Sequence, residues 1–409
     1  MPSNFKIIHD SIHGSIRIEE PLTSILETPE MQRLSNVRQL GLNYLVFPGA
    51  NHTRFEHCLG VSHLSGEIGR ILNLSEREIK MLRIAGLIHD IGHPPFSHTL
   101  ERLIKMKIGL DHVQIGSKII KNEIKISEKF NEKSIGEIIQ ENGLDMDEII
   151  SLFMNKTNEE IFGKKEKRKY LSKIINGDLD ADQLDYLLRD SHYTGVAYGI
   201  IDIQRILNTI TIFDDDIVFY DKGIESLESV MVARALMYSS VYFHKTARIA
   251  ELMLSRAIEN MENLNFYDIL SMNDSELISM LLQSEGYAKD IGTRIKFRQL
   301  FKKVAIFENI PDNFDPKNLK KLEKELAYES DAPEGYVLID FPIEELSINE
   351  PRVNYLDVKI LKNGKKYYLK NESSIVKALR SRKPIDYSLM IVAEKSYLEN
   401  VKKVLKRIF

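Results

Sequence analysis

The sequence predicts a mainly α-helical protein that begins with a small β-hairpin and ends in a lobe of mixed α+β structure. Apolar residues recur at helical spacing through most of the first 265 residues. Short alternating segments precede this region near the N-terminus and follow it after residue 336. Asn363-Gly364, between two of the later segments, is a strong hairpin signal. We therefore expect two domains, residues 1–265 and 266–409.

Length and composition favour a globular protein. The chain has 409 residues, 43% of them apolar and 28% charged, and lacks an apolar run of roughly 18 residues such as a membrane span needs. Its N-terminus has no secretion signal, so we expect a cytoplasmic location and no membrane partner. The single cysteine, Cys58, excludes an intrachain disulfide and a multi-thiolate zinc site. The net charge of -4 provides no overall basic field for long nucleic acids.

The N-terminal elements follow from alternation and helix-capping signals. Ile7 and Ile8 predict a strand, Asp10-Ser-Ile-His-Gly14 a turn, and Ile16 with Ile18 a second strand. Leu22, Ile25 and Leu26 then share a helical face. Thr28-Pro29 has the form of a helix N-cap followed by proline at the first helical position.

Two longer helices are expected next, over residues 55–72 and 79–89. Ser75 and Glu78 form a capping box that opens the second. Gly92, Pro94 and Pro95 end that helix, because glycine costs backbone entropy and proline removes an amide donor. The dipeptide His89-Asp90 is thus predicted at a helix C-terminus.

The remaining elements are predicted from periodicity and turn signals. Residues 113–176 predict amphipathic helices, 209–213 with 217–220 a hairpin, and 224–263 one long helix or two joined helices. The C-terminal lobe is expected to contain strands at 337–340, 356–361, 366–369 and 387–393, and helices at 374–380 and 395–408.

The chemically informative pattern is the order His57, His89-Asp90, Asp182. Imidazole nitrogens and carboxylate oxygens suit a divalent transition ion and leave positions for water and a substrate oxygen. Any one of these histidines could be an ordinary structural residue. However, seven of the 11 histidines lie between residues 52 and 112, and this clustering favours a site.

Three segments resemble the HD-domain superfamily: Asn51-His-Thr-Arg-Phe-Glu-His57, Gly86-Leu-Ile-His-Asp-Ile-Gly-His-Pro-Pro-Phe-Ser-His98 and Asp182-Gln-Leu-Asp-Tyr-Leu-Leu-Arg-Asp190. More closely, they resemble its deoxynucleoside triphosphate triphosphohydrolase branch. The resemblance spans most of residues 5–260 and implies a multi-helix HD-domain core. In that branch, attack at the α-phosphorus of a nucleotide substrate releases a nucleoside and inorganic triphosphate. The branch also implies a homo-oligomer, a dimer or tetramer.

The resemblance implies the site residues as well. The metal ligands would be His57, His89, Asp90 and Asp182. They would hold one divalent transition metal, with Mn, Fe, Ni, Co and Zn not distinguished, alongside Mg on the substrate phosphates. His98 would align with the scissile phosphate, supported by a relay of His112 and Glu101. The phosphates would be bound by Arg54, His93 and Arg234, the sugar by Gln39, Tyr186 and Asp190, and the sugar or base by Tyr242. Plain core packing is the alternative for the two tyrosines.

Two departures from the branch concern binding. Gln183 stands where relatives carry a phosphate-binding lysine, which removes a charge-assisted contact. Glu27 and Ser35 stand where relatives recognise an activating guanine nucleotide with aspartate and arginine, although Lys6 and Gln32 are retained. Serine cannot replace a guanidinium fork, so guanine-triggered activation is not expected to follow the relatives.

Two other functions stay open. One is an HD phosphodiesterase or nucleotidase, in which His93 or His112 would help to bind a second metal. The other is a nucleic-acid-binding or assembly protein with an inactive site. The basic segments that motivate weak nucleic-acid binding are residues 164–169 and, near the C-terminus, Lys402, Lys403, Lys406 and Arg407.

Overall fold

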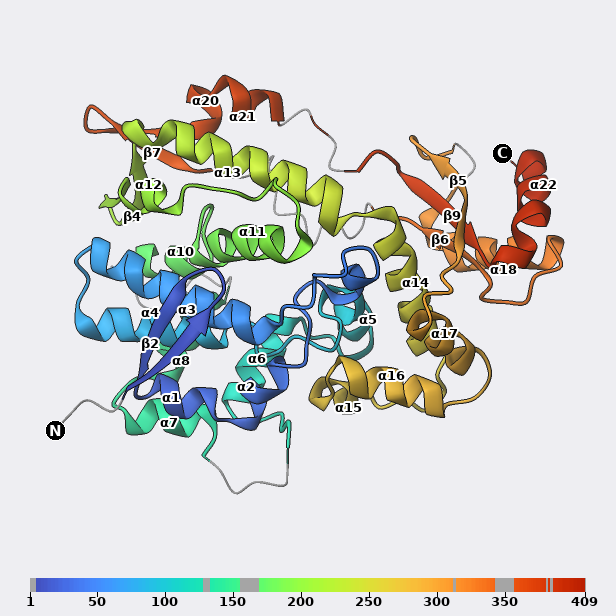
Figure 1. The fold of residues 1–409 in the computed structure, drawn as a ribbon, viewed down its shortest axis with the longest axis horizontal. Helices are drawn as coiled ribbons and strands as arrows, with labels where there is room; N and C mark the ends of the chain where they lie inside the picture. The colour runs from blue at the N-terminus through green and yellow to red at the C-terminus, as the bar shows by residue number, and fades with distance from the viewer. Residues whose placement is uncertain are drawn as a thin grey trace.

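The structure, a computed structural model, describes residues 5–127, 133–154, 169–311, 314–342, 357–379, 382 and 385–408. Helices dominate, a two-stranded hairpin lies at the N-terminus, and strands gather in the C-terminal part (Figure 1). The predicted fold class is confirmed. Across the described ranges, no helix is long and apolar enough to cross a membrane.

The N-terminal hairpin forms as the alternation predicts. β1 (Phe5–Asp10) pairs antiparallel with β2 (Gly14–Glu19), with Ile8 opposite Ile16. Ile16 and Ile18 are fully buried. The helices α1 (Leu22–Leu26) and α2 (Pro29–Leu34) follow, and the Thr28 side chain caps α2 by accepting from the backbone N–H of Met31.

Capped helices build the centre of the molecule. α3 (Arg54–Ile71) and α4 (Glu76–Ile88) each begin with a capping box, that of α4 being the predicted Ser75 and Glu78 pair. His89 is the C-cap of α4, so the predicted position of the His-Asp dipeptide is confirmed. The other helices that carry site residues are α5 (His98–Ile108), α6 (His112–Ile120) and α11 (Ala181–Thr194).

The predicted helical stretch over 224–263 consists of two joined helices. α13 (Ile224–Met237) passes through a π-helical turn, Tyr238–Tyr242, into α14 (Lys245–Glu259). The remaining described helices are α7 (Ile135–Glu141), α8 (Met146–Phe153), α10 (Lys169–Ile175), α12 (Ile203–Leu207), α15 (Phe266–Ser271), α16 (Asp274–Gln283), α17 (Gly286–Lys296), α18 (Leu319–Glu329), α20 (Leu369–Glu372), α21 (Ser374–Leu379) and α22 (Leu398–Ile408).

The later strands form, but they divide between two sheets. β9 (Leu389–Ala393) is the central strand of one sheet and pairs antiparallel with β6 (Val337–Asp340) on one side and, on the other, with β5 (Lys302–Phe307), a strand that the sequence analysis missed. β7 (Lys359–Lys362) and β8 (Lys365–Tyr368) make the Asn363-Gly364 hairpin. β7 also pairs in parallel with β4 (Asp216–Tyr220), which itself pairs with β3 (Ile210–Phe213).

This arrangement returns the C-terminal chain to the helical region. Figure 1 shows β7, α20 and α21 beside α13, whereas β5, β6, β9 and α22 lie at the opposite side of the molecule. The largest hydrophobic cluster correspondingly runs from Ile16 to Val392. The four-stranded sheet therefore joins residues on both sides of position 265, and the domain boundary placed there stays a prediction.

The β4–β7 pairing should carry measurable stability. Ile360 in β7 is fully buried opposite Phe219, so Ile360→Ala should lower the free energy of unfolding by about 2–5 kcal/mol in chemical denaturation, through lost contacts and a residual cavity. Tyr367, its cross-strand neighbour in β8, is 38% exposed and provides a matched control. Tyr367→Ala should cost distinctly less; equal losses would contradict this packing account.

Candidate functional site

The four predicted metal ligands come together from three helices. Nitrogen and oxygen atoms of His57 (α3), His89 and Asp90 (the end of α4) lie within 4.8 Å of one another. Asp182, in the first turn of α11, places Oδ1 2.9 Å from His57 Nε2 and 3.9 Å from His89 Nε2. Residues far apart in the sequence thus converge on one small polar centre.

Both imidazole rings are oriented for ligation. His89 Nδ1 lies 2.9 Å from the Gly86 carbonyl oxygen, which can only accept, so Nδ1 carries the hydrogen and Nε2 keeps its lone pair in the neutral ring. That Nε2 is buried and has no hydrogen-bond partner. His57 Nδ1 contacts Asp185 Oδ2 at 2.7 Å, which leaves its Nε2 facing the centre. Anchored δ nitrogens and inward ε nitrogens fit a divalent transition ion.

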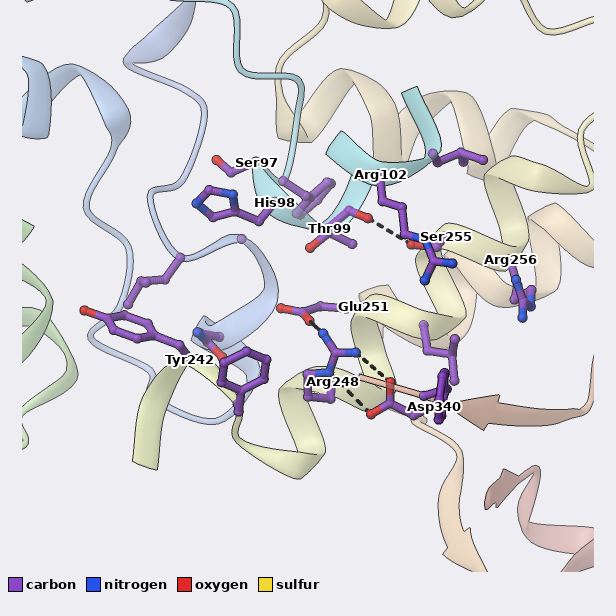
Figure 2. A pocket seen from close by; sticks show the side chains of 18 of the residues that line it. Ser97, His98, Thr99, Arg102, Tyr242, Arg248, Glu251, Ser255, Arg256 and Asp340 are labelled. Atoms are coloured by element: carbon purple, nitrogen blue, oxygen red, sulfur yellow. Dashed lines mark hydrogen bonds and ion pairs between the residues drawn. The ribbon is translucent and has the colours of Figure 1, made fainter. Parts of the chain in front are cut away.

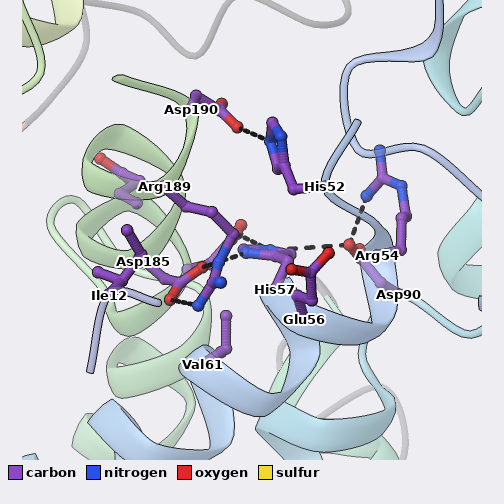
Figure 3. A network of polar contacts seen from close by, with 12 residues as sticks. Ile12, His52, Arg54, Glu56, His57, Val61, Asp90, Asp185, Arg189 and Asp190 are labelled. Carbon is purple, nitrogen blue, oxygen red and sulfur yellow. Dashed lines mark hydrogen bonds and ion pairs between the residues drawn. The ribbon is translucent and has the colours of Figure 1, made fainter. Parts of the chain in front are cut away.

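Asp185 is the buried support of this centre. Besides His57, its carboxylate contacts His13 Nε2 at 2.7 Å and accepts two hydrogen bonds of 2.9 Å from Arg189. Arg189 also donates to Asp10, the last residue of β1 before the hairpin turn, at 2.8 Å. Figure 3 shows Arg189 and Asp185 packed beside His57. The hairpin turn is thereby tied to a candidate metal ligand.

Sequence reasoning missed these supporting roles, although their spacing carried a signal. Asp185 lies three residues after Asp182 and Arg189 four after Asp185, so all three share one face of α11. Burial favours the neutral form of Asp185, but Arg189 and the two histidines hold its pKa well below the usual range. Burial likewise opposes charge on His57, yet hydrogen bonds to Asp182 and Asp185 raise its pKa to about 10. Ion binding at this centre would displace that proton.

Arg54 and His93 lie against the same centre. Arg54 is buried, pairs with Asp90 and donates from Nε to Ser97 Oγ at 2.7 Å. His93 Nε2 lies 3.4 Å from Asp90 Oδ1. Burial lowers the pKa of His93 well below its usual value, and the positive charge of Arg54 lowers it further. His93 is therefore a neutral imidazole next to a permanent cation.

His98, Glu101 and His112 form a connected group. One oxygen of Glu101 lies 3.0 Å from His98 Nδ1, and the other contacts His112 Nδ1. Burial opposes the charge on both Glu101 and His112, but their mutual attraction lowers the pKa of Glu101 well below normal and raises that of His112. His98 itself is 57% exposed in its side chain. A buried carboxylate thus orients one accessible imidazole and one buried imidazole.

A cavity of about 440 Å³ begins at this accessible imidazole. Five of the predicted site residues line it: His98, Gln39, Tyr186, Asp190 and Tyr242. Figure 2 shows His98 and Tyr242 near one end and Arg248, Arg256 and Asp340 towards the other. The pocket therefore extends from His98 along α14 to the C-terminal part of the chain.

The end of the pocket lined by Tyr186 and Tyr242 combines side chains fixed by hydrogen bonds with polar groups that have no hydrogen-bond partner. Tyr242 donates its hydroxyl to Asp190 Oδ2 at 2.7 Å, and His52 Nε2 contacts the other Asp190 oxygen at 2.7 Å. The rings of Tyr186 and Tyr242 meet edge to face, with centroids 6.1 Å apart. The Tyr186 hydroxyl and Gln39 Oε1 are buried without a hydrogen-bond partner. Such groups commonly mark a place where a polar ligand completes the network.

Arg234 differs from the other predicted substrate residues. It is fully buried, does not line the pocket, and donates from Nη1 to Gln183 Oε1 at 2.6 Å. Gln183 Nε2 in turn donates to the Gly177 carbonyl oxygen at 3.2 Å. The glutamine noted as a departure therefore fixes Arg234 behind the site.

Comparisons with known proteins agree with this geometry. A family model described as an HD domain matches residues 54–190, and one described as an HD associated region matches residues 201–409. The chain belongs to the HD-domain superfamily. The four candidate metal ligands lie within the HD match, and Arg234 and Tyr242 lie within the associated region.

Individual relatives extend this result. An uncharacterized protein of Methanocaldococcus jannaschii is 41% identical over 74% of this chain and 60% of its own length. The deoxynucleoside triphosphate triphosphohydrolase SAMHD1 homolog of Dictyostelium discoideum is 34% identical over 80% of this chain and 61% of its own. The chain thus spans about three fifths of these two proteins. A crystal structure of a hypothetical protein from Aquifex aeolicus matches with a TM-score of 0.74 and 29% identity, covering 98% of this chain and 100% of that one.

Family and geometry together support a metal-dependent hydrolase in general terms. The HD domain implies a divalent metal, and the His57, His89 and Asp90 cluster can hold one. The individual roles of the site residues stay predictions.

Removing the support of His57 should weaken metal binding. Asp185→Ala frees the His57 ring and leaves Arg189 without a partner inside the helix, so metal affinity should fall about tenfold to a hundredfold, as measured by titration of the metal-free protein. Glu101→Gln, which changes another buried carboxylate bound to two histidines, should leave metal affinity near that of the unaltered protein. Unchanged affinity in Asp185→Ala would refute the supporting role.

The Glu101–His112 pair should be visible in a pH titration. Because Glu101 raises the pKa of His112, the pair stabilises the fold below the ordinary histidine pKa and loses this contribution as pH rises through the raised value. Glu101→Gln should therefore lower the pKa of His112, measured by NMR of labelled histidine rings. Glu148→Gln, at an exposed carboxylate paired with Arg77, should leave it unchanged. An unaltered His112 titration in Glu101→Gln would contradict the pairing.

Proposed function

We propose that this protein is a deoxynucleoside triphosphate triphosphohydrolase, which cleaves dNTPs to deoxynucleoside and inorganic triphosphate by water attack at the α-phosphorus. The observation that carries the proposal is the position of His98. Its side chain lines the pocket, and its Nε2 lies 3.4 Å from Nη2 of Arg54, which pairs with Asp90. One imidazole thus stands between the candidate metal centre and the tyrosine-lined cavity.

In this proposal, charged side chains and one histidine that carries a proton act on the substrate phosphates. A divalent ion held by His57, His89, Asp90 and Asp182 would supply positive charge to the phosphoryl oxygens. Arg54 and His93 bind phosphate beside it, Arg234 adds charge from behind, and Mg²⁺ accompanies the triphosphate. With Nδ1 held by Glu101, His98 uses Nε2 to carry the proton that the departing 5′ oxygen requires.

The sugar end depends on Tyr186, Tyr242, Asp190 and Gln39. The Tyr242–Asp190 hydrogen bond fixes one wall of the pocket, and the free Tyr186 hydroxyl and Gln39 oxygen provide polar contacts for a sugar. Tyrosine rings packed against C2′ would leave no room for a 2′-hydroxyl, and the proposed enzyme would therefore prefer deoxynucleotides. The similarity to the Dictyostelium deoxynucleoside triphosphate triphosphohydrolase homolog supports the same substrate class.

An HD phosphodiesterase or nucleotidase is the second candidate. Its support is a further group, Asp90, His93 and His112, whose ligating atoms also lie within 4.8 Å of one another. Asp90 could then bridge two ions, an arrangement used for in-line displacement at phosphorus. A metal count per chain distinguishes the two candidates.

Four further properties belong to this proposal: oligomeric state, location, nucleotide activation and nucleic-acid binding. We expect a homo-oligomer, dimer or tetramer, in the cytoplasm. The Glu27 position pairs with Lys6 at an exposed site, so an activating nucleotide would have to displace that ion pair. Weak nucleic-acid binding would use the exposed basic residues of α22, since residues 164–168 lie outside the described part of the chain.

Product analysis tests the proposal. The protein, loaded in turn with Mn, Fe, Ni, Co or Zn and supplied with Mg, should convert dNTPs to deoxynucleoside and triphosphate, with label from ¹⁸O-water in the triphosphate. Asp182→Ala should abolish metal binding and turnover together, and His98→Ala should keep metal binding but lower turnover to a small residual rate. His192→Ala, at an exposed histidine of α11, should leave both intact. Monophosphate, pyrophosphate or phosphate as the product would favour the second candidate, and no turnover with any metal would refute both.

A further inference from the structure

The backbone just before His98 adopts an unfavourable conformation. Phe96 has φ of 56°, and Ser97 has φ of 51° with ψ of -118°. Two consecutive non-glycine residues at positive φ are sterically disfavoured and persist only where surrounding contacts impose them. Ser97 is also the N-cap of α5 without capping it. Its hydroxyl instead donates to the Arg38 carbonyl oxygen at 3.1 Å.

Asp274, from the start of α16, supplies such a contact. Its Oδ1 accepts the backbone N–H of Phe96 at 2.8 Å, and its Oδ2 accepts the backbone N–H of Arg38 at 3.1 Å. The carboxylate is 1% exposed. One buried side chain therefore fastens the strained turn to the segment that carries Arg38.

The start of α16 is also linked to the first residues of the loop that follows His89-Asp90. Arg33 donates from Nη2 to the carbonyl oxygens of Ile91 and His93, each at 2.9 Å, and from Nη1 to that of Met272 at 3.1 Å. Residues 272–274 are thus linked to the loop after the His-Asp dipeptide both at its start, through Arg33, and at its end, through Asp274.

A role in helix capping does not explain Asp274. Asn273 is the N-cap of α16, and its Oδ1 accepts from the backbone N–H groups of Ser275 and Glu276 at 3.0 and 3.1 Å. Burial raises the pKa of Asp274 despite its hydrogen bonds, because desolvation penalises the charged form. The carboxylate also faces the Arg38 guanidinium, with Nη1 3.4 Å from Oδ2, and its hydrogen bond to the Phe96 amide is the contact that reaches the turn before His98.

We propose that Asp274 is a positioning residue for His98: by fixing the left-handed Phe96–Ser97 turn, it aims the imidazole at the scissile phosphate. This inference rests on the proposed function. It adds a positioning role to the HD associated region, since Asp274 lies within that match and outside the residues matched by the HD domain itself.

The first test separates kcat from KM. Asp274→Ala should lower kcat about tenfold to a hundredfold, the cost expected for an ångström-scale displacement of a catalytic group, with KM within about threefold and metal content unchanged. Asp274→Asn, which retains one acceptor oxygen, should lose less. Leu277→Ala, a fully buried residue of the same helix, should lower thermal stability but keep kcat. Equal loss of kcat in Leu277→Ala and Asp274→Ala, or full kcat in Asp274→Ala, would overturn the proposal.

A double mutant tests whether Asp274 acts through His98. In a His98→Ala background, Asp274→Ala should reduce the residual rate by less than about twofold, because coupled residues are not additive. Full additivity would overturn the proposed route.

Hydrogen exchange keeps the inference separable from the proposed activity. Asp274→Ala should speed exchange of the Phe96 amide, read by mass spectrometry of peptides over 91–100, whereas Leu277→Ala should not. If the protein hydrolyses no dNTP but this amide loses protection, the proposed function is refuted, whereas the role of Asp274 in fixing the Phe96–Ser97 turn is supported. If the amide exchanges equally in both variants, the role of Asp274 in fixing this turn is refuted.

Discussion

The buried Asp185 carboxylate is the interaction on which the rest of the site depends. It is fully buried, and it meets one histidine from the hairpin turn, one from α3 and an arginine from its own helix. Burying such a charge is costly unless every oxygen is paired. Here the pairing is complete, so the hairpin, α3 and α11 must adopt one relative arrangement, and that arrangement directs the ε nitrogen of His57 inward.

Two different electrostatic environments lie next to each other at the site. Around Asp182 and Asp90 the carboxylates outnumber the fixed cations, which suits an ion. Around Arg54 and His93 a buried guanidinium lies beside an imidazole that burial keeps neutral, which suits phosphate oxygens. Asp90 belongs to both environments because it contacts Arg54 and lies 3.4 Å from His93. Charge developing on a phosphate would therefore meet positive potential from two sides.

Local signals predicted local structure well, and long-range pairing poorly. The Ser75 and Glu78 capping box, the break at Gly92 and the Asn363-Gly364 turn all specify conformation within a few residues, and each formed as expected. β5 was missed, and the parallel partner of β4 lies about 140 residues later, a distance over which periodicity carries no information. Asp185 could have been found from its place on the Asp182 face of α11. Asp274 could not, because its partners, the backbone amides at positions 38 and 96 and the Arg38 side chain, lie far from it in the sequence.

Gln183 shows why a substitution in a family motif cannot be interpreted from charge alone. A lysine at this position would bring an ammonium charge towards the Arg234 guanidinium, and the two cations would repel unless an anion lay between them. Glutamine presents an oxygen to Arg234 at 2.6 Å and a nitrogen to the Gly177 carbonyl oxygen at 3.2 Å. Arg234 is therefore held in place before any ligand arrives, at the cost of one formal charge. Gln183 and Arg234 therefore act as one unit, and neither position can be judged without the other.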